Sequence, residues 1–531
     1  MKKFGILKSV AESVGASRTI HTVLAGLILF AAAFIRIVSA NSDLWFDEIW
    51  SLHLIKTISS PLGIFTSIHH DNNHYLNSLF MYIFSSVDSS LLYRAPAVLA
   101  GVGSVAAAGL IGKRQSITNA VISMLLMTFS YLMVLYSSEA RGYAFVVFFS
   151  LLSFYLMLRY MEERTYFFAI LVSLSMTLGF ASHLTFLNFF AAAAIWSCYT
   201  LARSFTGIKQ AFGSLFSCYA LPIVYLILVY VLDISQLGIE VLVSEKTPSN
   251  VVEGLDNAFK WATGFPFSGH AGYLLILVAL SLLAMGLYQL QLEKSDQWPF
   301  FFSVIILIPV ILAIVRQPSV LYPRYFLVPT GFFLLLIGQG LSFLYNRGRW
   351  GKILTVFLIT LFITANGEYV IELMKFGRGQ YSEAVRFLKE KSVSDYVVIS
   401  DERNDPTIAL LLQYYSRKNW SERLQDIYWI HSGSWADKDS DSNTLIKLSS
   451  VKFLGEADKF GYDSTDCMVL PKDTGSRVGP EWMILWRIPS YKQPPPPKTL
   501  FDKIGNRYDM VKSYRTAQLS GYSWYIFHNN L

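Results

Sequence analysis

Long apolar stretches, separated by short polar ones, dominate the chain from near its start to about residue 372. A helix of about 20 residues spans a hydrocarbon core of about 30 Å, and the apolar stretches are close to this length. They therefore predict membrane-spanning helices. The eleven expected spans are residues 19–40, 92–112, 117–136, 142–160, 166–183, 185–203, 212–233, 270–291, 299–316, 325–345 and 352–372.

The first apolar stretch has one feature of a signal peptide, because Val38-Ser39-Ala40 would suit a cleavage enzyme. Its length argues against that interpretation, since the apolar part of a signal peptide runs for only about 7–15 residues. We therefore expect an uncleaved membrane anchor.

Basic residues in the short connections all fall on one side of the expected bundle. The positive-inside rule makes this side cytoplasmic. The N-terminus is then inside, and eleven spans leave the C-terminal tail outside. The basic residues are Lys2, Lys3, Lys8, Arg18, Lys113, Arg114, Arg159, Arg164, Arg203, Lys209, Lys294, Arg347, Arg349 and Lys352.

Three segments on the expected outer side are too long to be simple turns: residues 41–91, residues 234–269 and the tail from about 373. Within the first segment, apolar residues recur at helical spacing between polar ones, which predicts an amphipathic helix lying in the membrane interface. A second short helix is expected near Asn77. The apolar residues of the first helix are Ile49, Leu52, Ile55 and Ile58.

The tail changes from membrane-like patterns to short helical and strand patterns, which predicts a small α/β domain. We therefore divide the chain into an all-α membrane module, residues 1–372, and an extracytoplasmic α/β domain, residues 373–531. The tail elements expected are helices at 382–390 and 407–415, strands at 395–401, 466–470, 482–488 and 522–528, and an extended linker at Pro494–Pro497.

Composition supports a membrane protein and weakens other classes. Hydrophobic residues make up 53% of the chain and charged residues 15%, whereas soluble domains average about 25% charged residues. The net charge is +7, but the bases lie between apolar stretches, where they meet lipid phosphates, so no nucleic-acid partner is expected. The 3 cysteines fit neither a disulfide framework nor a zinc site.

Charged residues at membrane depth, or just outside it, are costly and are functional candidates by default. Asp47 and Glu48 follow the first span directly. A carboxylate held there can act as a general base on a hydroxyl group or can bind a metal ion. The alternative is a helix cap, because Asp is favoured at helix N-termini. The two roles are compatible.

A second polar cluster follows in the same segment, with Asp71, Asn72, Asn73 and His74 at its centre. Imidazole and carboxylate groups suit zinc or manganese. The histidines do not recur at a helical spacing, however. We therefore favour residues that shape a substrate pocket over a metal site.

Short turns on the expected outer side carry further charges. Glu139 and Arg141 lie in one such turn, and Arg324 opens a late span against the positive-inside bias. These groups could form local ion pairs, which contribute little where they are exposed, or an arginine could grip a phosphate through two hydrogen bonds. Arg94 heads the second span, and His183 ends the fifth, where a structural role is the simpler reading.

Taken in order, these motifs resemble the C-type (GT-C) glycosyltransferases over residues 19–372. The nearest relatives are the bacterial branch related to protein O-mannosyltransferases, lipid A aminoarabinose transferase and the rhizobial lipopolysaccharide galacturonosyltransferases. The motifs are the Asp-Glu pair, the Asp-Asn-Asn-His loop, Tyr-Arg-Ala-Pro-Ala-Val-Leu-Ala-Gly, Ser-Glu-Ala-Arg-Gly-Tyr and Arg-Tyr-Phe-Leu-Val-Pro.

The resemblance implies an enzyme of the cell envelope that acts at the outer face of the bacterial cytoplasmic (inner) membrane. It would move a sugar from a polyprenyl-phosphate donor to a lipid, glycan or protein acceptor, with inversion. Asp47 is the implied base, Glu48 its neighbour, and Arg94, Arg141 and Arg324 match positions near the donor phosphate. The implied substrate-pocket residues are Asp71, Asn72, Asn73, His74, Glu139, Tyr143, His183 and Tyr325.

One motif departs from the pattern, because many relatives have His-Pro-Pro-Leu-Tyr where this chain has His74-Tyr-Leu-Asn77. The acceptor class and the role of His74 are therefore open. Metal use varies across the superfamily, so a divalent metal ion stays open as a cofactor.

Two other functions remain as alternatives. A transporter would place ionisable residues near the bilayer midplane and pair broken helices, whereas the charges noted here lie at the outer ends of spans. An O-antigen ligase or polymerase would place its basic cluster in a late outer loop. The 234–269 segment offers only Lys246, Lys260 and His270 nearby.

Overall fold

The computed structural model describes most of the membrane part of the chain and separate pieces of the tail. Two compact units result: the first comprises residues 1–40 and 54–371, and the second comprises residues 41–53 and 372–531. The described residues are 2–203, 208–236, 248–265, 270–316, 322–391, 411, 414–415, 427–430, 447–448, 451–454, 467–468, 482–487, 498–502 and 507–529.

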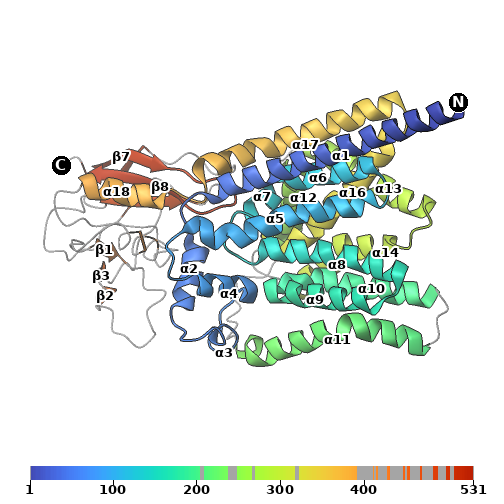
Figure 1. Cartoon of the computed structure of the whole chain (residues 1–531). Helices are drawn as coiled ribbons and strands as arrows, with labels where there is room; N and C mark the ends of the chain where they lie inside the picture. Colours follow the sequence, from blue (N-terminus) through green and yellow to red (C-terminus); the bar gives the residue numbers. More distant parts are fainter. Residues whose placement is uncertain are drawn as a thin grey trace. The chain divides into compact units, whose positions relative to one another are not determined.

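The first unit is a bundle of apolar helices (Figure 1). Among the described residues, 8 helices are long and apolar enough to cross a membrane, and three more are apolar but shorter. Together they coincide with the eleven expected spans, so the prediction of a polytopic all-α membrane module is confirmed. The helices are α1 (Lys2–Ala40), α5 (Ser90–Lys113), α6 (Ile117–Phe129), α7 (Tyr131–Tyr136), α8 (Tyr143–Glu163), α9 (Tyr166–Ser182), α10 (Leu187–Arg203), α11 (Ile208–Leu232), α13 (His270–Leu292), α14 (Trp298–Phe302), the π-helical turn η3 (Ser303–Leu307), α15 (Ile308–Arg316), α16 (Leu327–Tyr345) and α17 (Arg349–Phe376).

Helix α16 lies at the centre of this unit, since 89% of its apolar window is buried, against 22% for α11 and for α17. Aromatic rings from three helices meet beside it. The centroid of Phe300 lies 4.4 Å from that of Phe154 and 4.9 Å from that of Phe332. Such pairs add to the dispersion contacts that hold helices together where water is absent.

Short elements connect the long helices, and we call the end of the bundle where α1 stops the Ala40 end. The expected interfacial helix is α2, most of which belongs to the second unit, and it ends at Ile55, before Ile58. The second short helix expected near Asn77 is α4. In the segment 234–269, residues 237–247 and 266–269 lie outside the described residues. The short elements are α2 (Phe46–Ile55), α3 (Gly63–Thr66), α4 (Tyr75–Ile83), η1 (Leu184–Phe186), η2 (Ile234–Gln236), α12 (Pro248–Thr263) and η4 (Pro323–Phe326).

The third expected span is not one helix. Ser130 leaves the helical conformation, with φ −61° and ψ 120°, so that α6 ends at Phe129 and α7 begins at Tyr131. No proline or glycine marks this break in the sequence. Side chains on α1 and α17 form hydrogen bonds with the backbone on either side of this break.

The second unit contains helix α18 (Tyr381–Lys391) and two described sheets. The larger sheet has the order β4-β6-β7-β8-β5, in which β4 and β6 are parallel and the other pairs antiparallel. The smaller sheet has the order β1-β3-β2. The strands are β1 (Ile427–Ile430), β2 (Lys447–Leu448), β3 (Val451–Leu454), β4 (Cys467–Met468), β5 (Trp482–Arg487), β6 (Thr499–Asp502), β7 (Arg507–Tyr514) and β8 (Ser523–Asn529).

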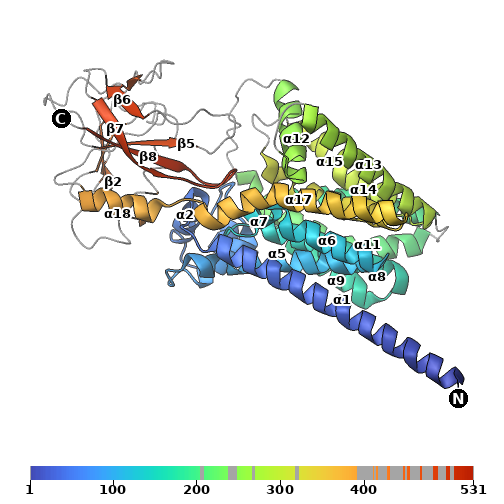
Figure 2. The same ribbon diagram turned by 90° about the horizontal axis from the view of Figure 1, so that it is seen from above.

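Helix α18 packs against β7 and β8, beside which it lies in both views (Figures 1 and 2). The buried Tyr381 is central to this contact. Its ring lies 5.1 Å from that of Trp524, and its hydroxyl accepts a hydrogen bond from the Tyr522 amide at 2.8 Å. Burial raises the pKa of the Tyr381 hydroxyl, so this group stays protonated and donates to the carbonyl of Arg378.

Residues 41–53 belong to this second unit, although the sequence analysis placed them with the membrane module. The Asp43 carboxylate accepts hydrogen bonds from the amide and hydroxyl groups of Ser382, at 2.7 and 2.9 Å, at the start of α18. A carboxylate is favoured there by the helix dipole. The Tyr415 hydroxyl donates to the carbonyl of Leu44 at 2.7 Å. These contacts bind distant segments of sequence into one domain.

The tail expectations are confirmed where the structure describes them. The helix expected at 382–390 is α18, and strands appear at 467–468, 482–487 and 523–529. Strands β6 and β7 were not expected, because their polar residues obscure the alternation. The strand expected at 395–401 and the linker Pro494–Pro497 lie outside the described residues, as does most of the helix expected at 407–415.

Candidate functional site

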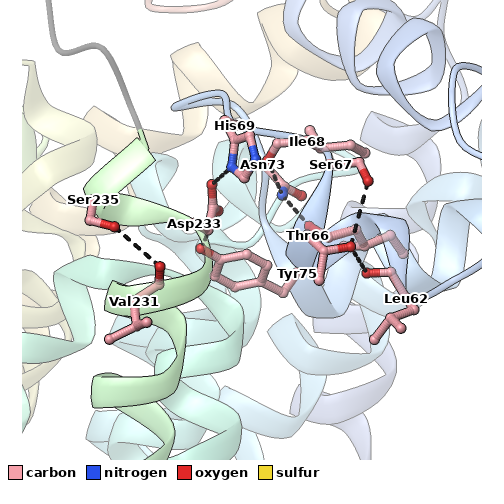
Figure 3. Close-up of polar contacts among 11 residues, drawn as sticks. Leu62, Thr66, Ser67, Ile68, His69, Asn73, Tyr75, Val231, Asp233 and Ser235 are labelled. Carbon is pink, nitrogen blue, oxygen red and sulfur yellow. Dashed lines mark hydrogen bonds and ion pairs between the residues drawn. The ribbon is translucent and has the colours of Figure 1, made fainter.

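The loop between α3 and α4 is held by its own polar side chains. The Asn73 amide group donates to the carbonyls of Ile64 and Ile68, at 2.7 and 3.1 Å, and its oxygen accepts from the Ser78 hydroxyl at 2.9 Å. Asn73 was expected in the substrate pocket. In the structure it ties the loop to α3 and α4 (Figure 3).

Asp233, at the C-terminal end of α11, anchors the same loop to the bundle (Figure 3). It is 2% exposed. Its carboxylate lies 2.9 Å from Nδ1 of His69 and accepts a 2.5 Å hydrogen bond from the Tyr75 hydroxyl. Burial raises the pKa of Tyr75, and the bond to Asp233 raises it further. The sequence analysis missed this residue, although a carboxylate at the end of an apolar span is a recognisable signal.

The turn between α7 and α8 is fixed from two sides. The Asn77 amide group donates to the carbonyl of Ala140 at 2.7 Å. On the other side, a Cβ on Gly142 would lie 2.0 Å from the carbonyl oxygen of Ser182 and 3.2 Å from the Cβ of His74. Only glycine permits this close approach. The turn therefore holds Glu139 and Arg141 against α4 and the end of α9.

Two histidines and a tyrosine stack behind this turn. The ring centroids are 4.8 Å apart for His74 and His183, 4.6 Å for Tyr143 and His183, and 5.5 Å for His74 and Tyr143. The sequence places these residues in three separate segments, so the structure brings together three of the predicted pocket residues.

Both histidines are neutral. Burial, followed by the positive charge of Arg141, lowers the pKa of His183 to about 3 and that of His74 well below its ordinary value. Nδ1 of His183 accepts from the Thr185 amide at 3.0 Å, which leaves the proton on Nε2. Nε2 of His74 is buried and has no hydrogen-bond partner among the described residues.

Two guanidinium groups act on this stack from different segments of the chain. Arg141 donates to the amide oxygen of Asn72 at 2.6 Å and lies 4.9 Å from the Tyr143 centroid. Arg324 lies 4.5 Å from the centroid of Tyr322 and 5.5 Å from that of Tyr325. The charges of both arginines lower the pKa values of His74 and His183.

The two arginines also act on Asp71. The hydrogen bond from His70 is the main cause of the lowered pKa of Asp71, and the two guanidinium charges add to it. The Asp71 side chain is 92% exposed. It therefore lies at the water-facing margin of the cluster, whereas Glu139 is fully buried within the turn.

Arg94 serves a different contact in the described structure. Its guanidinium is fully buried and donates to the carbonyl of Ala40, the last residue of α1, at 2.8 Å. This bond ties the start of α5 to the end of α1. A role beside the donor phosphate stays a prediction for this residue.

Asp47 and Glu48 belong to the second unit, where they open α2. The Glu48 carboxylate accepts from the Trp45 amide at 3.0 Å and is fully buried. This is the reciprocal half of a capping box, in which a glutamate in the first turn satisfies the amide that precedes the helix. The capping role considered for Asp47 is thus filled by Glu48, while Asp47 is half-buried.

A buried arginine that the sequence analysis missed lies in the same unit. Arg378 is 1% exposed, and its guanidinium lies 5.1 Å from the Trp45 ring. It follows the last apolar span within Phe376-Gly-Arg-Gly. A cation just beyond a span end is the signal that could have identified it.

The histidines of the segment 69–77 do not gather around one point where a metal ion could bind. His69 turns to Asp233, and His74 stacks on His183. Within the described ranges, no group of three or more His, Cys, Asp or Glu side chains could hold a metal ion.

No protein-family model matches the chain, and no curated protein is similar to it in sequence. Solved structures are similar at low identity. ArnT from Cupriavidus metallidurans in the apo state is 12% identical, over 78% of this chain and 86% of ArnT, with a TM-score of 0.49. ArnT bound to undecaprenyl phosphate is 11% identical, over 80% and 86%, with a TM-score of 0.47.

Archaeal oligosaccharyltransferase AglB from Archaeoglobus fulgidus, in complex with an inhibitory peptide and a dolichol-phosphate, is also similar. It is 11% identical over 75% of this chain and 64% of AglB, with a TM-score of 0.47.

Proposed function

We propose that this chain is a membrane glycosyltransferase that moves a sugar from a polyprenyl-phosphate donor to a lipid, glycan or protein acceptor. The proposal rests first on the order of motifs in the sequence. The observation that carries it furthest is that Arg141 lies over the ring of Tyr143, which contacts the two buried histidines, His74 and His183, while the charge of Arg324 acts on the same pair.

This arrangement suits a lipid-linked phosphate. Guanidinium groups bind phosphate oxygens through paired hydrogen bonds. A neutral histidine that carries its proton on Nε2, as His183 does, can donate to an oxygen without needing a countercharge. The same groups would stabilise the charge that develops on the departing phosphate.

The reaction needs a base that removes the proton of the acceptor hydroxyl. The phosphate leaves as a stable anion, so acid assistance to this leaving group matters less. We assign this role to Asp47. Since Glu48 caps α2, the neighbouring carboxylate is the better candidate for chemistry. Attack on the anomeric carbon from the face opposite the phosphate would invert its configuration.

The proposal includes a side of the membrane. The one-sided distribution of Lys and Arg puts the Ala40 end and the tail outside the cytoplasm. An alkaline phosphatase fused after residue 531 should be active. An inactive phosphatase, together with an active cytoplasmic reporter at the same position, would overturn this orientation and the outer-face reaction.

The lipid-linked sugars of a deletion strain test the function itself. If the chain consumes a polyprenyl-phosphate sugar, one such lipid should accumulate in the deletion strain and return to its normal level on complementation. Complementation by an Asp47→Asn variant should fail at equal protein abundance. An unchanged lipid profile in the deletion strain, with no sugar missing from any envelope acceptor, would favour a transporter.

A further inference from the structure

The break between α6 and α7 frees several backbone groups inside the bundle, and one amide–carbonyl pair among them has partners from elsewhere in the fold. In a continuous α-helix, the amide of Tyr131 would donate to the carbonyl of Met127, four residues earlier. The conformation of Ser130 prevents this bond. Buried backbone groups in a membrane need partners, because no water is available to supply them.

Side chains from two other helices supply both partners. The amide oxygen of Asn366, on α17, accepts from the Tyr131 amide at 2.8 Å. One guanidinium nitrogen of Arg36, on α1, donates to the Met127 carbonyl at 3.1 Å. Both groups of this pair thus receive the kind of partner that they lost, and the two partners come from different helices.

Further hydrogen bonds and burial fix the side chains of Asn366 and Arg36 in this position. Asn366 is fully buried, and its own amide nitrogen donates to the Phe362 carbonyl at 3.0 Å, which fixes its orientation. Arg36 is 1% exposed, and its second terminal nitrogen donates to the Ala32 carbonyl at 3.2 Å. The side chain therefore turns back along α1. An arginine that only needed water would extend toward the Ala40 end.

The broken helix leads directly into the candidate site. Helix α7 has 6 residues, Tyr131–Tyr136, and the turn that carries Arg141 follows it. A small cavity of about 10 Å³ is lined by both Arg36 and Tyr143, and the neighbours of Tyr143 include His74 and His183. The break thus lies close to the candidate site.

We propose that Arg36 and Asn366 are positioning residues, which hold the α6–α7 break so that the following turn presents Arg141 to the donor phosphate. This inference rests on the proposed function. The two residues do not touch the donor. They set the direction and height of α7, and small displacements of a binding group carry a large cost in a preorganised site.

The test removes each partner separately and measures donor binding. Arg36→Met and Asn366→Leu each leave one backbone group without its partner, and each should raise the donor KM at least tenfold while the acceptor KM stays within twofold. Arg36→Lys keeps a donor for the Met127 carbonyl and should restore much of the affinity. Binding of a polyprenyl phosphate to the full chain in detergent should follow the same order.

The matched control is Arg114→Met. Arg114 lies just after α5 and pairs with Glu162, away from the candidate site, so the donor KM should not change. Wild-type donor KM values in both Arg36→Met and Asn366→Leu would overturn the inference. Equal losses of donor and acceptor affinity would also overturn it, because they would indicate a general structural role.

Two further observations keep the test decisive. If Arg36→Met does not fold, Asn366→Ser takes its place as the test variant. It shortens the side chain that accepts the hydrogen bond from the Tyr131 amide, so hydrogen exchange at that amide should accelerate. A wild-type chain that binds no polyprenyl phosphate would contradict the proposed function. A wild-type chain that binds it, with variants that bind it equally well, would contradict only the positioning role.

Discussion

The two ends of the helical bundle use arginine in different ways. At the end with the basic connections, arginines pair with neighbouring carboxylates. Exposed pairs of this kind contribute about 0–1 kcal/mol each. They leave little charge for a ligand, because each cation is balanced where it lies. The pairs are Arg114–Glu162, Arg159–Glu163 and Arg203–Asp296.

At the Ala40 end, the described contacts of Arg141 and Arg324 include the faces of tyrosine rings and, for Arg141, an amide oxygen. A ring face and an amide fix the orientation of a charged guanidinium. The charges of Arg141 and Arg324 lower the pKa values of His74 and His183. The comparison teaches that the arginines of the basic connections hold neighbouring carboxylates, whereas Arg141 and Arg324 lie against aromatic rings and act on two buried histidines.

Asp47→Asn should have the largest effect, because it removes the proposed base and keeps the shape of the side chain. General bases contribute about 10²–10⁴-fold to rates. Donor binding, expression and thermal stability should stay near wild type, and transfer should be lost. The matched control is Glu48→Gln, whose amide oxygen can still accept from the Trp45 amide. A variant with more than about a tenth of wild-type activity, equivalent to less than about 1.4 kcal/mol, would show that Asp47 is not the base.

Replacing Arg141 or Arg324 with lysine should have the next largest effect. Lysine keeps the charge but loses the paired hydrogen bonds. A hydrogen bond to a charged group contributes about 1.5–3 kcal/mol, so donor affinity should fall by roughly ten- to a hundredfold in a direct binding assay. Arg159→Lys is the control at the other end. Unchanged donor affinity in both site variants would remove the distinction between the two ends.

Acid should destabilise the Ala40 end through its histidines. The folded chain holds the pKa of His183 near about 3, below its ordinary value of 6.5. Below pH 6.5 an unfolded chain binds a proton that the folded chain does not, so the free energy of unfolding should fall as the pH falls, until about pH 3. The slope is about 1.4 kcal/mol per pH unit for each such histidine. Melting curves of wild type and His183→Asn between pH 7 and 5 measure it, and an equal slope in both proteins would contradict the argument.

The smallest effect is expected from Arg203→Met. Its side chain is 60% exposed and that of its partner, Asp296, is 41% exposed. The loss should be below about 1 kcal/mol in stability and should vanish at high salt. A melting-temperature series in salt checks this value. A larger, salt-resistant loss would mean that pairs at this end also hold the fold together.

Local patterns were sufficient for the helices, because a span is recognised by its own apolar length. The same approach found the residues of the site without their partners. His74, Tyr143 and His183 were each expected in a pocket, but no pattern within their own segments shows that they stack. The break at Ser130 was missed for the same reason, since the side chains that bond to its freed backbone groups, Arg36 and Asn366, lie on helices far away in the sequence.

The helix-capping residue and the domain to which residues 41–53 belong were harder still to predict from the sequence. The sequence offered an aspartate, Asp47, as the helix cap, and only the geometry shows that the Glu48 carboxylate accepts from the Trp45 amide. The boundary near residue 372 was expected. The inclusion of residues 41–53 in the tail domain was not, because hydrogen bonds such as that between Asp43 and Ser382 leave no mark in either segment.

That shared domain has a consequence for biosynthesis. Residues 41–53 leave the ribosome early, yet their partners in the fold, including Ser382 and Tyr415, are made more than 300 residues later. The early segment must therefore wait, on the correct side of the membrane, until the last helix has been inserted. Closing so long a loop is slow, and domains that depend on distant segments are prone to misassembly. A ribosome that stops after α17 would leave the apolar helices that the structure describes in the membrane and the segment bearing Asp47 without the domain that shapes it.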